Sequence, residues 1–540
     1  MSPRKRGEPG PFCVAHDTPS PGLASLLSGL ADLQDSLHSQ PSGSGLADLQ
    51  ISLNSQTSGS GLAAPQDSRD PEPSGSGPGI TSSEVTRARD RPLESRAMPM
   101  RLTFDRGTIL CDEPCTAGGM KFDPRVRASR APAHSYSTLV RELAARGIAF
   151  LDAVRATTSE PGRFAPIALR PYQQDAVLAW QSCGRRGLVV LPTGAGKTRV
   201  AMAAMAECGL RTLVLVPTRV LLEQWQENLA KFYEGPIGLL GDGHVQVEPI
   251  SVATFESAYR RMAEIGARFD LLVVDEVHHF GSGARDECLW MAIAGARLGL
   301  TATPTWSESL DLLMGPIVFE LGLGELMGTH LAPLRHIVMH APLDAEERRL
   351  YDGDAKCFFA ELLAFRDLAP SGTWTDFMRS ACKSASGRTA LESWRRMKRI
   401  VAACAAKRRI LGELLARHRE ARVLVFTADN ESAYSIAREH CILPITSDIK
   451  RAERSTSLEH FKSGRVRALV SARVLNEGLD VPDAEIGIVV GATLGQRELQ
   501  QRIGRLLRPR AGKHAVLYEL VAQDTIEASQ ARRKHAALRS

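Results

Sequence analysis

Long apolar runs and paired cysteines are both missing from this chain of 540 residues. No stretch approaches the roughly 18 uninterrupted apolar residues of a membrane-spanning helix, which argues against a membrane protein. The ten cysteines are scattered, and the closest pair, Cys111 and Cys115, has no second pair at metal-ligand spacing. We interpret them as ordinary buried thiols of a reducing compartment. The first ten residues carry basic side chains with no apolar stretch behind them, which argues against secretion.

A strong excess of one charge is missing as well. The net charge is +6, which is small for this length and does not by itself indicate a nucleic-acid partner. Hydrophobic residues at 43% and charged residues at 24% are values of a globular protein. Because the chain is too long for a single hydrophobic core, we expect about three or four domains.

Residues 1–99 have the composition of a low-complexity segment. Gly, Ser and Pro occupy 41 of these 99 positions, and Phe12 is the only aromatic residue. A sixteen-residue unit recurs there, as GLADLQDSLHSQPSGS from Gly29 and GLADLQISLNSQTSGS from Gly45. The apolar content is too low for a core, so we predict a disordered tail. A tail that binds a partner is the alternative.

Beyond this tail the pattern predicts an α/β protein with two doubly wound parallel-sheet lobes. Residues 100–163 are expected to form a small α+β domain, 164–330 the first lobe and 421–540 the second. In both lobes, short and nearly continuous apolar runs alternate with helical segments, as in strands that are buried on both faces of a parallel sheet. The expected strands are 188–191, 212–216, 250–253, 271–274, 298–301, 422–427, 466–471, 485–490 and 515–520.

Residues 331–420 are predicted to form a linker and a basic helical insertion. Between 365 and 420 the chain holds 13 Lys and Arg against 5 Asp and Glu, a net charge of +8 that exceeds that of the whole chain. The basic clusters are interleaved with Trp374 and Trp394, which favours a surface that follows nucleic-acid phosphates over a merely solvated helix face. The candidate nucleic-acid contacts in this insertion are Arg395, Arg396 and Lys407.

The most informative segment is LPTGAGKT at 191–198, a strand that runs into a glycine-rich turn and ends in Lys-Thr. Successive backbone N–H groups of such a turn wrap a pyrophosphate, Lys197 reaches the β- and γ-phosphates, and the hydroxyl of Thr198 is a ligand for Mg²⁺. The residues of the turn that are expected to bind the phosphates are Thr193, Gly194, Ala195, Gly196, Lys197 and Thr198.

A second segment, VVDEVHH at 273–279, brings two carboxylates to the carboxyl end of an apolar strand. Asp275 is expected to hold the Mg²⁺, and Glu276 is expected to orient an attacking water. Together with the phosphate loop, this pair predicts a site that hydrolyses a nucleotide.

Six further segments stand in the order that belongs to superfamily 2 helicases and translocases, which the chain resembles. In the first lobe these are LRPYQQ at 169–174, VPTRVLLEQW, SVATF and LGLTATP. LRPYQQ resembles the adenine-reading motif, with Arg170 and with Gln173, whose amide suits the adenine edge. The groups suited to a nucleic-acid backbone are Thr218, Arg219 and Thr254. Thr301 and Thr303 are expected to sense the γ-phosphate.

The second lobe supplies RVLNEGLDVPDAEIGIVV and QQRIGRLLRP. In QQRIGRLLRP, Arg505 and Arg508 are three residues apart, on one helical face, and both are expected to point at the γ-phosphate. Gly478 and Asp480 are expected at the same cleft.

Within the superfamily the chain resembles the xeroderma pigmentosum group B (XPB) family in its short archaeal and bacterial form. The similarity rests on DEVHH, LGLTATP, the RGTIL…KFDPR…GIAF unit ahead of LRPYQ and the basic insertion, and it runs from about residue 100 to the end. The resemblance implies a damage-recognition-like domain, two RecA-like lobes and a thumb-like insertion at about 350–409. It also implies ATP and Mg²⁺, and 3′→5′ unwinding or translocation of DNA in repair or transcription, often beside a nuclease partner.

One departure from the family weakens the expectation of unwinding. The family's Arg-Glu-Asp element after the threonines of LGLTAT is associated with strand separation, and here Trp306, Ser307 and Glu308 stand in its place. Trp306 stacks on a base at a fork in one interpretation and packs under the lobe in the other. In addition, Asn476 stands where the family tends to have an aspartate. ATP hydrolysis is therefore a firmer expectation than unwinding.

Other functions stay open at this stage. The motor subunit of a restriction or anti-phage system shares these motifs, and a nuclease domain, which the sequence does not reveal, would favour it. An ATP-switched DNA-binding scaffold would not unwind at all, and RNA remodelling is a weaker alternative. We expect a monomer that binds duplex, forked or single-stranded DNA in a prokaryotic cytoplasm, at the nucleoid. The basic run at 3–6 leaves a nuclear factor open.

Overall fold

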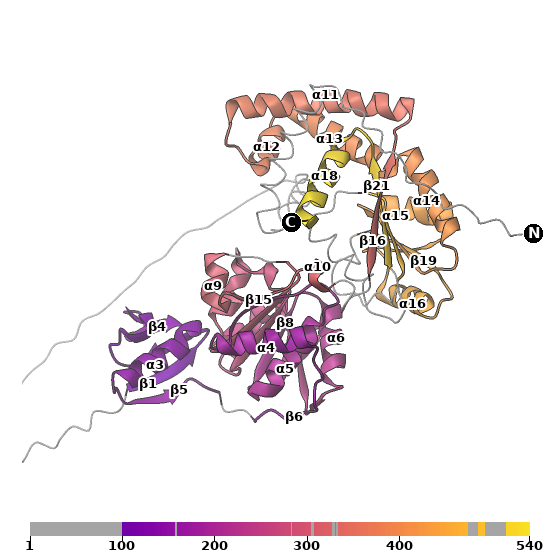
Figure 1. The fold of residues 1–540 in the computed structure, drawn as a ribbon. Coiled ribbons are helices and arrows are strands. Elements are labelled where there is room, and N and C mark those ends of the chain that lie inside the picture. The colour runs from indigo at the N-terminus through magenta and orange to yellow at the C-terminus, as the bar shows by residue number, and fades with distance from the viewer. Residues whose placement is uncertain are drawn as a thin grey trace, which may run out of the picture.

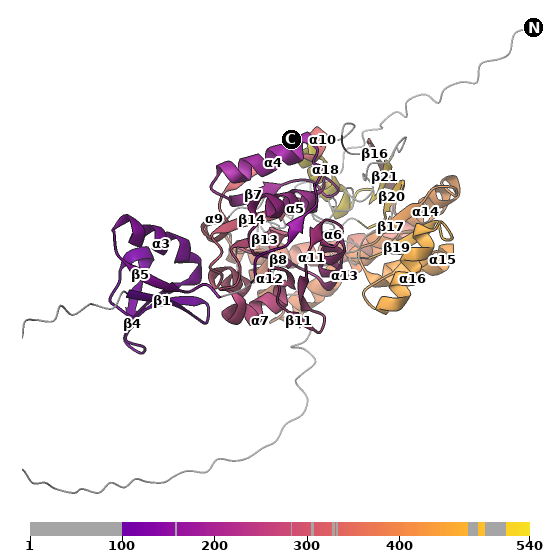
Figure 2. The same cartoon turned by 90° about the horizontal axis from the view of Figure 1, so that it is seen from below.

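The computed structural model describes residues 100–156, 159–281, 283–303, 307–326, 330, 333–472, 484–491 and 515–539. The repeats of residues 1–99 therefore lie outside the described residues, as do Trp306, Asn476, Gly478, Asp480, Arg505 and Arg508. In Figures 1 and 2 the amino-terminal domain, the first lobe and the second lobe lie in a row. None of the helices in the described part of the chain is both long and apolar enough to cross a membrane.

The amino-terminal domain is a five-stranded sheet with one α-helix. Its strand order is β3-β4-β2-β1-β5, and β1 pairs with β2 antiparallel and with β5 parallel. RLTFDRGTIL forms a hairpin, because Arg106 and Gly107 both have positive φ, 45° and 85°, and form a two-residue turn between β1 and β2. The elements are β1 Met100–Asp105, β2 Thr108–Cys111, β3 Lys121–Asp123, β4 Ala128–Pro132, α3 Tyr136–Ala145 and β5 Phe150–Ala153.

The first lobe is an eight-stranded sheet of order β11-β10-β12-β8-β13-β14-β7-β15, in which only β11 pairs antiparallel. Along β13, Leu271 and Val273 pack toward helices α4, α5 and α6, whereas Leu272 and Val274 pack toward α7, α8 and α9. This burial on both faces explains the continuous apolar runs of the sequence.

The helices of the first lobe are α4 Pro171–Ser182, α5 Lys197–Cys208, α6 Arg219–Leu229, α7 Phe255–Ile265, α8 Glu287–Trp290, α9 Glu308–Met314 and α10 Leu323–Leu326. The strands of its sheet are β7 Arg186–Val190, β8 Thr212–Val216, β10 Ile237–Gly241, β11 His244–Gln246, β12 Ile250–Thr254, β13 Leu271–Asp275, β14 Ala296–Thr301 and β15 Ile317–Glu320. A separate two-stranded ribbon joins β6 Arg163–Phe164 to β9 Tyr233–Glu234.

The second lobe is a six-stranded, fully parallel sheet of order β16-β21-β20-β17-β19-β18. Strand β16 falls within the residues that the sequence assigned to the linker and insertion, yet it pairs with β21 over eight residues. The strands are β16 Leu334–Ala341, β17 Val423–Phe426, β18 Leu443–Ile445, β19 Ala468–Ser471, β20 Ile486–Val489 and β21 Ala515–Ala522. The helices are α14 Ala405–Arg417, α15 Asn430–His440, α16 Arg451–Lys462 and α18 Ile526–Arg539.

The helical insertion stands above the lobes in Figure 1 and consists of α11 Ala345–Leu368, α12 Trp374–Ala381 and α13 Ala385–Ala403. Its aromatic residues form a core of their own. Trp374 is 6% exposed, and its ring lies 5.3 Å from that of Trp394. Trp374 is therefore a core residue, and its interpretation as part of a nucleic-acid surface is wrong. Trp394 is only partly buried, with the ammonium of Lys398 4.2 Å from the centre of its ring, so its place in such a surface stays a prediction.

Candidate functional site

The phosphate loop lies between β7 and α5 and turns at two glycines. Gly194 and Gly196 have φ angles of 87° and 85°, which side chains rarely allow. A Cβ atom at Gly196 would also stand 2.4 Å from Nε2 of Gln173. Because α5 begins directly after Gly196, its first backbone N–H groups have no partner inside the helix and are available to an anion.

Helix α4 holds this loop in place. The hydroxyl of Tyr172 and Nε2 of Gln173 each donate a hydrogen bond to the carbonyl of Ala195, both at 2.8 Å. Oε1 of Gln173 accepts from the backbone N–H of Arg170 at 2.9 Å, and Nη1 of Arg170 donates to the carbonyl of His330 at 3.0 Å. Gln173 therefore braces the loop, and its contact with adenine stays a prediction. The sequence reading missed Tyr172, whose only signal is its place beside Gln173.

Asp275 ends β13 at the carboxyl edge of the sheet and is only 6% exposed. Its Oδ1 accepts from the N–H of Glu276 at 3.0 Å, and its Oδ2 accepts from Nε1 of Trp225 at 2.9 Å. Burial raises the pKa of Asp275, while the charge of Lys197 and the two hydrogen bonds lower it. Lys197 also donates to the carbonyl of Leu191 at 3.3 Å. Sequence reasoning did not identify Trp225, although it lies on the apolar face of its helix.

Glu276 adopts a left-handed backbone conformation, with φ 51° and ψ 50°. A residue other than glycine in this region is strained, and such strain gathers at functional sites. Its Oε2 lies 3.4 Å from Nδ1 of His278, and that nitrogen lies 3.2 Å from Oγ1 of Thr301. The hydroxyl of Thr301 donates to the carbonyl of Thr303 at 3.0 Å. His278, which was not singled out from the sequence, thus connects the carboxylate to the LGLTATP segment.

These groups fit a triphosphate with its Mg²⁺. The buried hydroxyl of Thr193 has no hydrogen-bond partner among the described residues, and it stands in the loop whose backbone suits phosphate. Thr198 and Asp275 offer the oxygen ligands that Mg²⁺ prefers. Ligands of open parallel sheets bind beyond the carboxyl ends of the strands, which is where the loop and the carboxylates lie.

The residues expected to contact a nucleic-acid backbone occupy the same edge of the sheet. Thr218 caps α6 by accepting from the N–H of Leu221, and Thr254 caps α7 by accepting from the N–H of Ser257. Arg219 is exposed and forms an ion pair with Asp242 at 2.8 Å. The structure gives these threonines a local role, and their nucleic-acid contacts stay predictions.

In and beside the insertion, the three basic candidates have different environments. Arg395 is exposed, and Arg396 is exposed but forms an ion pair with Asp354 at 2.6 Å. Lys407 lies at the start of α14 and is 0% exposed, with its ammonium 2.6 Å from Oε2 of Glu527. The prediction that Lys407 contacts nucleic acid is therefore wrong, since a buried ammonium cannot reach a phosphate. The four second-lobe candidates, Gly478, Asp480, Arg505 and Arg508, lie outside the described residues.

Comparisons with known proteins agree with this arrangement. The family model of the xeroderma pigmentosum group B helicase damage recognition domain matches residues 102–154. The model of the type III restriction enzyme res subunit matches 166–306, and that of the helicase conserved C-terminal domain matches 406–510. The DNA 3′-5′ translocase XPB2 of Sulfurisphaera tokodaii is 34% identical over 440 residues, which cover 80% of this chain and 99% of that protein. The chain belongs to the XPB helicase family.

Other members of the XPB family are similar over a smaller share of their length. The putative DNA 3′-5′ helicase Rad25 of Halobacterium salinarum is 30% identical over 67% of this chain and 56% of that protein. The DNA 3′-5′ helicase XPB of Mycobacterium tuberculosis is 28% identical over 67% of this chain and 62% of that protein. The chain thus spans somewhat more than half of these two longer relatives. As an XPB-family protein it is an ATP-hydrolysing helicase with two RecA-like lobes, which confirms the predicted fold class and enzyme class.

Proposed function

We propose that this protein is a DNA motor in which hydrolysis of ATP at the first lobe drives movement along DNA with 3′→5′ polarity. The observation that supports it most is the shared sheet edge of the phosphate loop and the Asp275–Glu276 pair, with the candidate backbone contacts Thr218 and Thr254 beside them. The polarity is taken from the printed names of the relatives, which are 3′-5′ translocases and helicases.

In the proposed mechanism, the N–H groups of the loop and the ammonium of Lys197 bind the β- and γ-phosphates. Thr198 and Asp275 would hold Mg²⁺, which neutralises phosphate charge when it is bound. Glu276 orients the attacking water and takes up its proton. His278 and Thr301 connect this carboxylate to the segment expected to sense the γ-phosphate.

The second lobe completes the site in this proposal. Arg505 and Arg508 approach the γ-phosphate when the lobes close, with Gly478 and Asp480 at the same cleft. Guanidinium groups supplied in this way stabilise the charge of the transition state. After hydrolysis both lobes lose the phosphate that they share, the cleft reopens, and DNA held through its phosphates advances.

We further propose that the protein acts as a monomer on duplex, forked or single-stranded DNA during repair, beside a nuclease partner, at the nucleoid of a prokaryotic cell. The damage recognition match at 102–154 supports a role in repair. The restriction-motor alternative is less well supported, since a translocase named XPB2 matches over 99% of its own length.

An ATPase assay with single-stranded, duplex and forked DNA and with RNA tests the proposal. We expect DNA to accelerate turnover more than RNA does. We also expect the apparent DNA affinity to fall by about 10³-fold or more between 50 and 200 mM salt if six or more phosphates are contacted. Turnover that no DNA accelerates would favour the ATP-switched scaffold and refute the motor. Strand displacement and triplex displacement assays on the same samples separate unwinding from translocation.

A further inference from the structure

The hydrogen bond from Trp225 to Asp275 joins two elements that the proposed function treats separately. The donor lies on α6, whose first turn carries the candidate backbone contacts, and the acceptor is the candidate Mg²⁺ ligand at the end of β13. Both side chains are buried, with Trp225 1% and Asp275 6% exposed. The bond length of 2.9 Å is that of a well-formed N–H···O bond.

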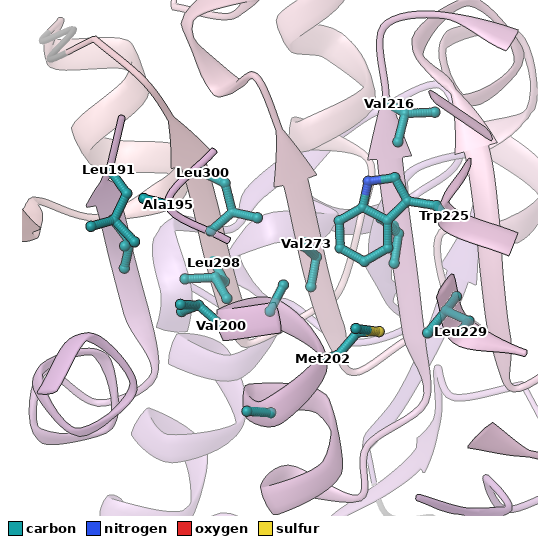
Figure 3. Packing of buried hydrophobic residues seen from close by; sticks show 14 of the residues in the cluster. Leu191, Ala195, Val200, Met202, Val216, Trp225, Leu229, Val273, Leu298 and Leu300 are labelled. Atoms are coloured by element: carbon teal, nitrogen blue, oxygen red, sulfur yellow. The ribbon is translucent and has the colours of Figure 1, made fainter. Parts of the chain in front are cut away.

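The fold explains how the indole reaches the carboxylate. Strand β8 lies directly beside β13, and α6 begins just after β8, at the carboxyl edge of the sheet. Leu222, Trp225 and Leu229 form the buried face of this helix. Because helical side chains lean toward the amino terminus of their helix, an indole two turns into α6 leans back toward the edge where Asp275 stands. Figure 3 shows Trp225 between Val216 of β8 and Val273 of β13.

The bond restrains the carboxylate in a way that few side chains can. An indole N–H donates and never accepts, so it favours the charged form of Asp275 and fixes the position of Oδ2. The N–H of Glu276 fixes Oδ1, and it belongs to the same strand end. Trp225 is therefore the side chain through which a different element orients this carboxylate. Such outer partners of a metal ligand affect metal affinity by about 10–100-fold.

The other end of α6 carries the groups that would sense DNA. Thr218 caps the helix, and the guanidinium of Arg219 is exposed beside Asp242. Trp225 is six residues beyond Arg219, about 9 Å along the helix axis. A helix of this length moves as a rigid element, so a displacement of its first turn shifts the indole as well.

We propose that Trp225 is a positioning residue that couples DNA engagement at the first turn of α6 to the orientation of the Asp275 carboxylate. The proposal rests on the proposed function for its DNA contact. Binding of a phosphate backbone at Thr218 and Arg219 shifts α6, and the indole N–H carries that shift to the Mg²⁺ ligand. DNA then accelerates ATP hydrolysis by ordering Asp275, in addition to any effect of lobe closure.

The test compares two substitutions of buried tryptophans in the same lobe. Trp225→Phe removes the N–H and keeps an aromatic ring. Trp180→Phe is the matched control, because Trp180 is 0% exposed and its Nε1 donates at 2.8 Å to the carbonyl of Arg297, on another element. The readouts are the Mg²⁺ dependence of binding of a fluorescent ATP analogue without DNA, equilibrium DNA binding, and the ratio of ATPase rates with and without DNA.

We expect Trp225→Phe to weaken the apparent Mg²⁺ affinity by about tenfold or more and to lose most of the DNA stimulation, with unchanged DNA binding. Trp180→Phe should keep the wild-type Mg²⁺ dependence and stimulation ratio. If the two variants behave alike, the coupling role is refuted. If Trp225→Phe does not fold, 3-benzothienylalanine at position 225 keeps the indole shape, replaces the N–H by sulfur, and answers the same question.

The outcomes also separate this inference from the proposed function. If wild-type turnover is not accelerated by DNA, the motor proposal fails while the Mg²⁺ titration still decides whether Trp225 orients Asp275. If wild-type turnover is accelerated and Trp225→Phe retains both its Mg²⁺ affinity and its stimulation, the motor stands and the coupling through Trp225 is wrong.

Discussion

Lys407 and Glu527 form an ion pair inside the second lobe, with Nζ 2.6 Å from Oε2 and side-chain exposures of 0% and 3%. The ammonium also donates to the carbonyl of Val490 at 2.8 Å, and Oε2 also accepts from the N–H of Ala522. The pair therefore links α14 and α18 to the ends of β20 and β21.

Removal of one partner should destabilise this lobe strongly. In Lys407→Met a buried carboxylate loses its counter-charge, and we expect a loss of about 3–5 kcal/mol in the free energy of unfolding. In the double variant Lys407→Met/Glu527→Gln no buried charge remains, and Ala522 keeps an acceptor, so much of the loss should be recovered. Urea unfolding measures both. A double variant no more stable than Lys407→Met would contradict this account of the pair.

The hydrogen bonds from α4 to the carbonyl of Ala195 in the phosphate loop predict how Gln173 contributes to nucleotide binding. Gln173→Leu removes one buried and one partly buried hydrogen bond of about 1 kcal/mol each, and we expect the affinity for a fluorescent nucleotide to fall by about tenfold. If Gln173 only braces the loop, ATP and GTP analogues weaken equally. If it reads adenine, the preference for ATP is lost. Gln181→Leu, at the other end of the same helix, is the control and should bind both as the wild type does.

Docking of the amino-terminal domain on the first lobe should depend on pH. The ring of His134 packs edge-on against Trp290 of the lobe at 4.3 Å, and burial, aided by the charges of Arg297 and Arg186, lowers the pKa of His134 to about 4. Below its unfolded pKa of about 6.5, the unfolded chain binds a proton that the folded chain excludes. The stability that a neutral His134 contributes is therefore present above pH 6.5 and is lost as the pH falls toward 4.

The measurement is the thermal unfolding midpoint between pH 7 and pH 4.5 for the wild type and for His134→Leu. We expect the midpoint of His134→Leu to fall less steeply over this range. His244→Leu serves as the control, because His244 is exposed. Identical slopes for His134→Leu and the wild type would show that this histidine is not protonated on unfolding.

Local patterns predicted most of the interior strands of both sheets, although β10 of the first lobe was not expected. Runs such as LLVV before Asp275 and TLVLV before Thr218 are buried on both faces, so they carry an unbroken apolar signal, and the observed strands agree with them. The glycine turn was equally clear from the sequence, because Gly194 and Gly196 take the positive φ that glycine allows.

Sequence patterns led to wrong predictions for charged residues whose hydrogen-bond or ion-pair partners lie elsewhere along the chain. Strand β14 was expected to begin at 298, yet it begins at Ala296. It includes Arg297, which is 0% exposed and donates to four backbone carbonyls. Lys407 was predicted to contact nucleic acid as part of a basic surface, and its carboxylate partner lies 120 residues further on. No local pattern reveals such a partner.

In the second lobe, strand β16 could not be predicted because it is defined by pairing with a segment far away in the sequence. Strand β16 is at the sheet edge, so most of its residues are only partly buried and its polar residues hide the apolar signal. Its partner β21 follows more than 170 residues later. The hydrogen bond from Trp225 to Asp275 also joins residues that are far apart in the sequence. The helix pattern places Trp225 in the core, but only the fold shows what its N–H contacts.

The most direct test of the whole account is the turnover of Glu276→Gln with saturating DNA, measured beside its affinity for a fluorescent ATP analogue. A glutamine keeps the shape of the side chain and cannot accept the proton of the attacking water. We predict nucleotide binding close to the wild type and a turnover at least about 10²-fold lower, with Glu264→Gln, on the exposed surface of α7, as an active control. Turnover of Glu276→Gln at the wild-type rate would contradict the account.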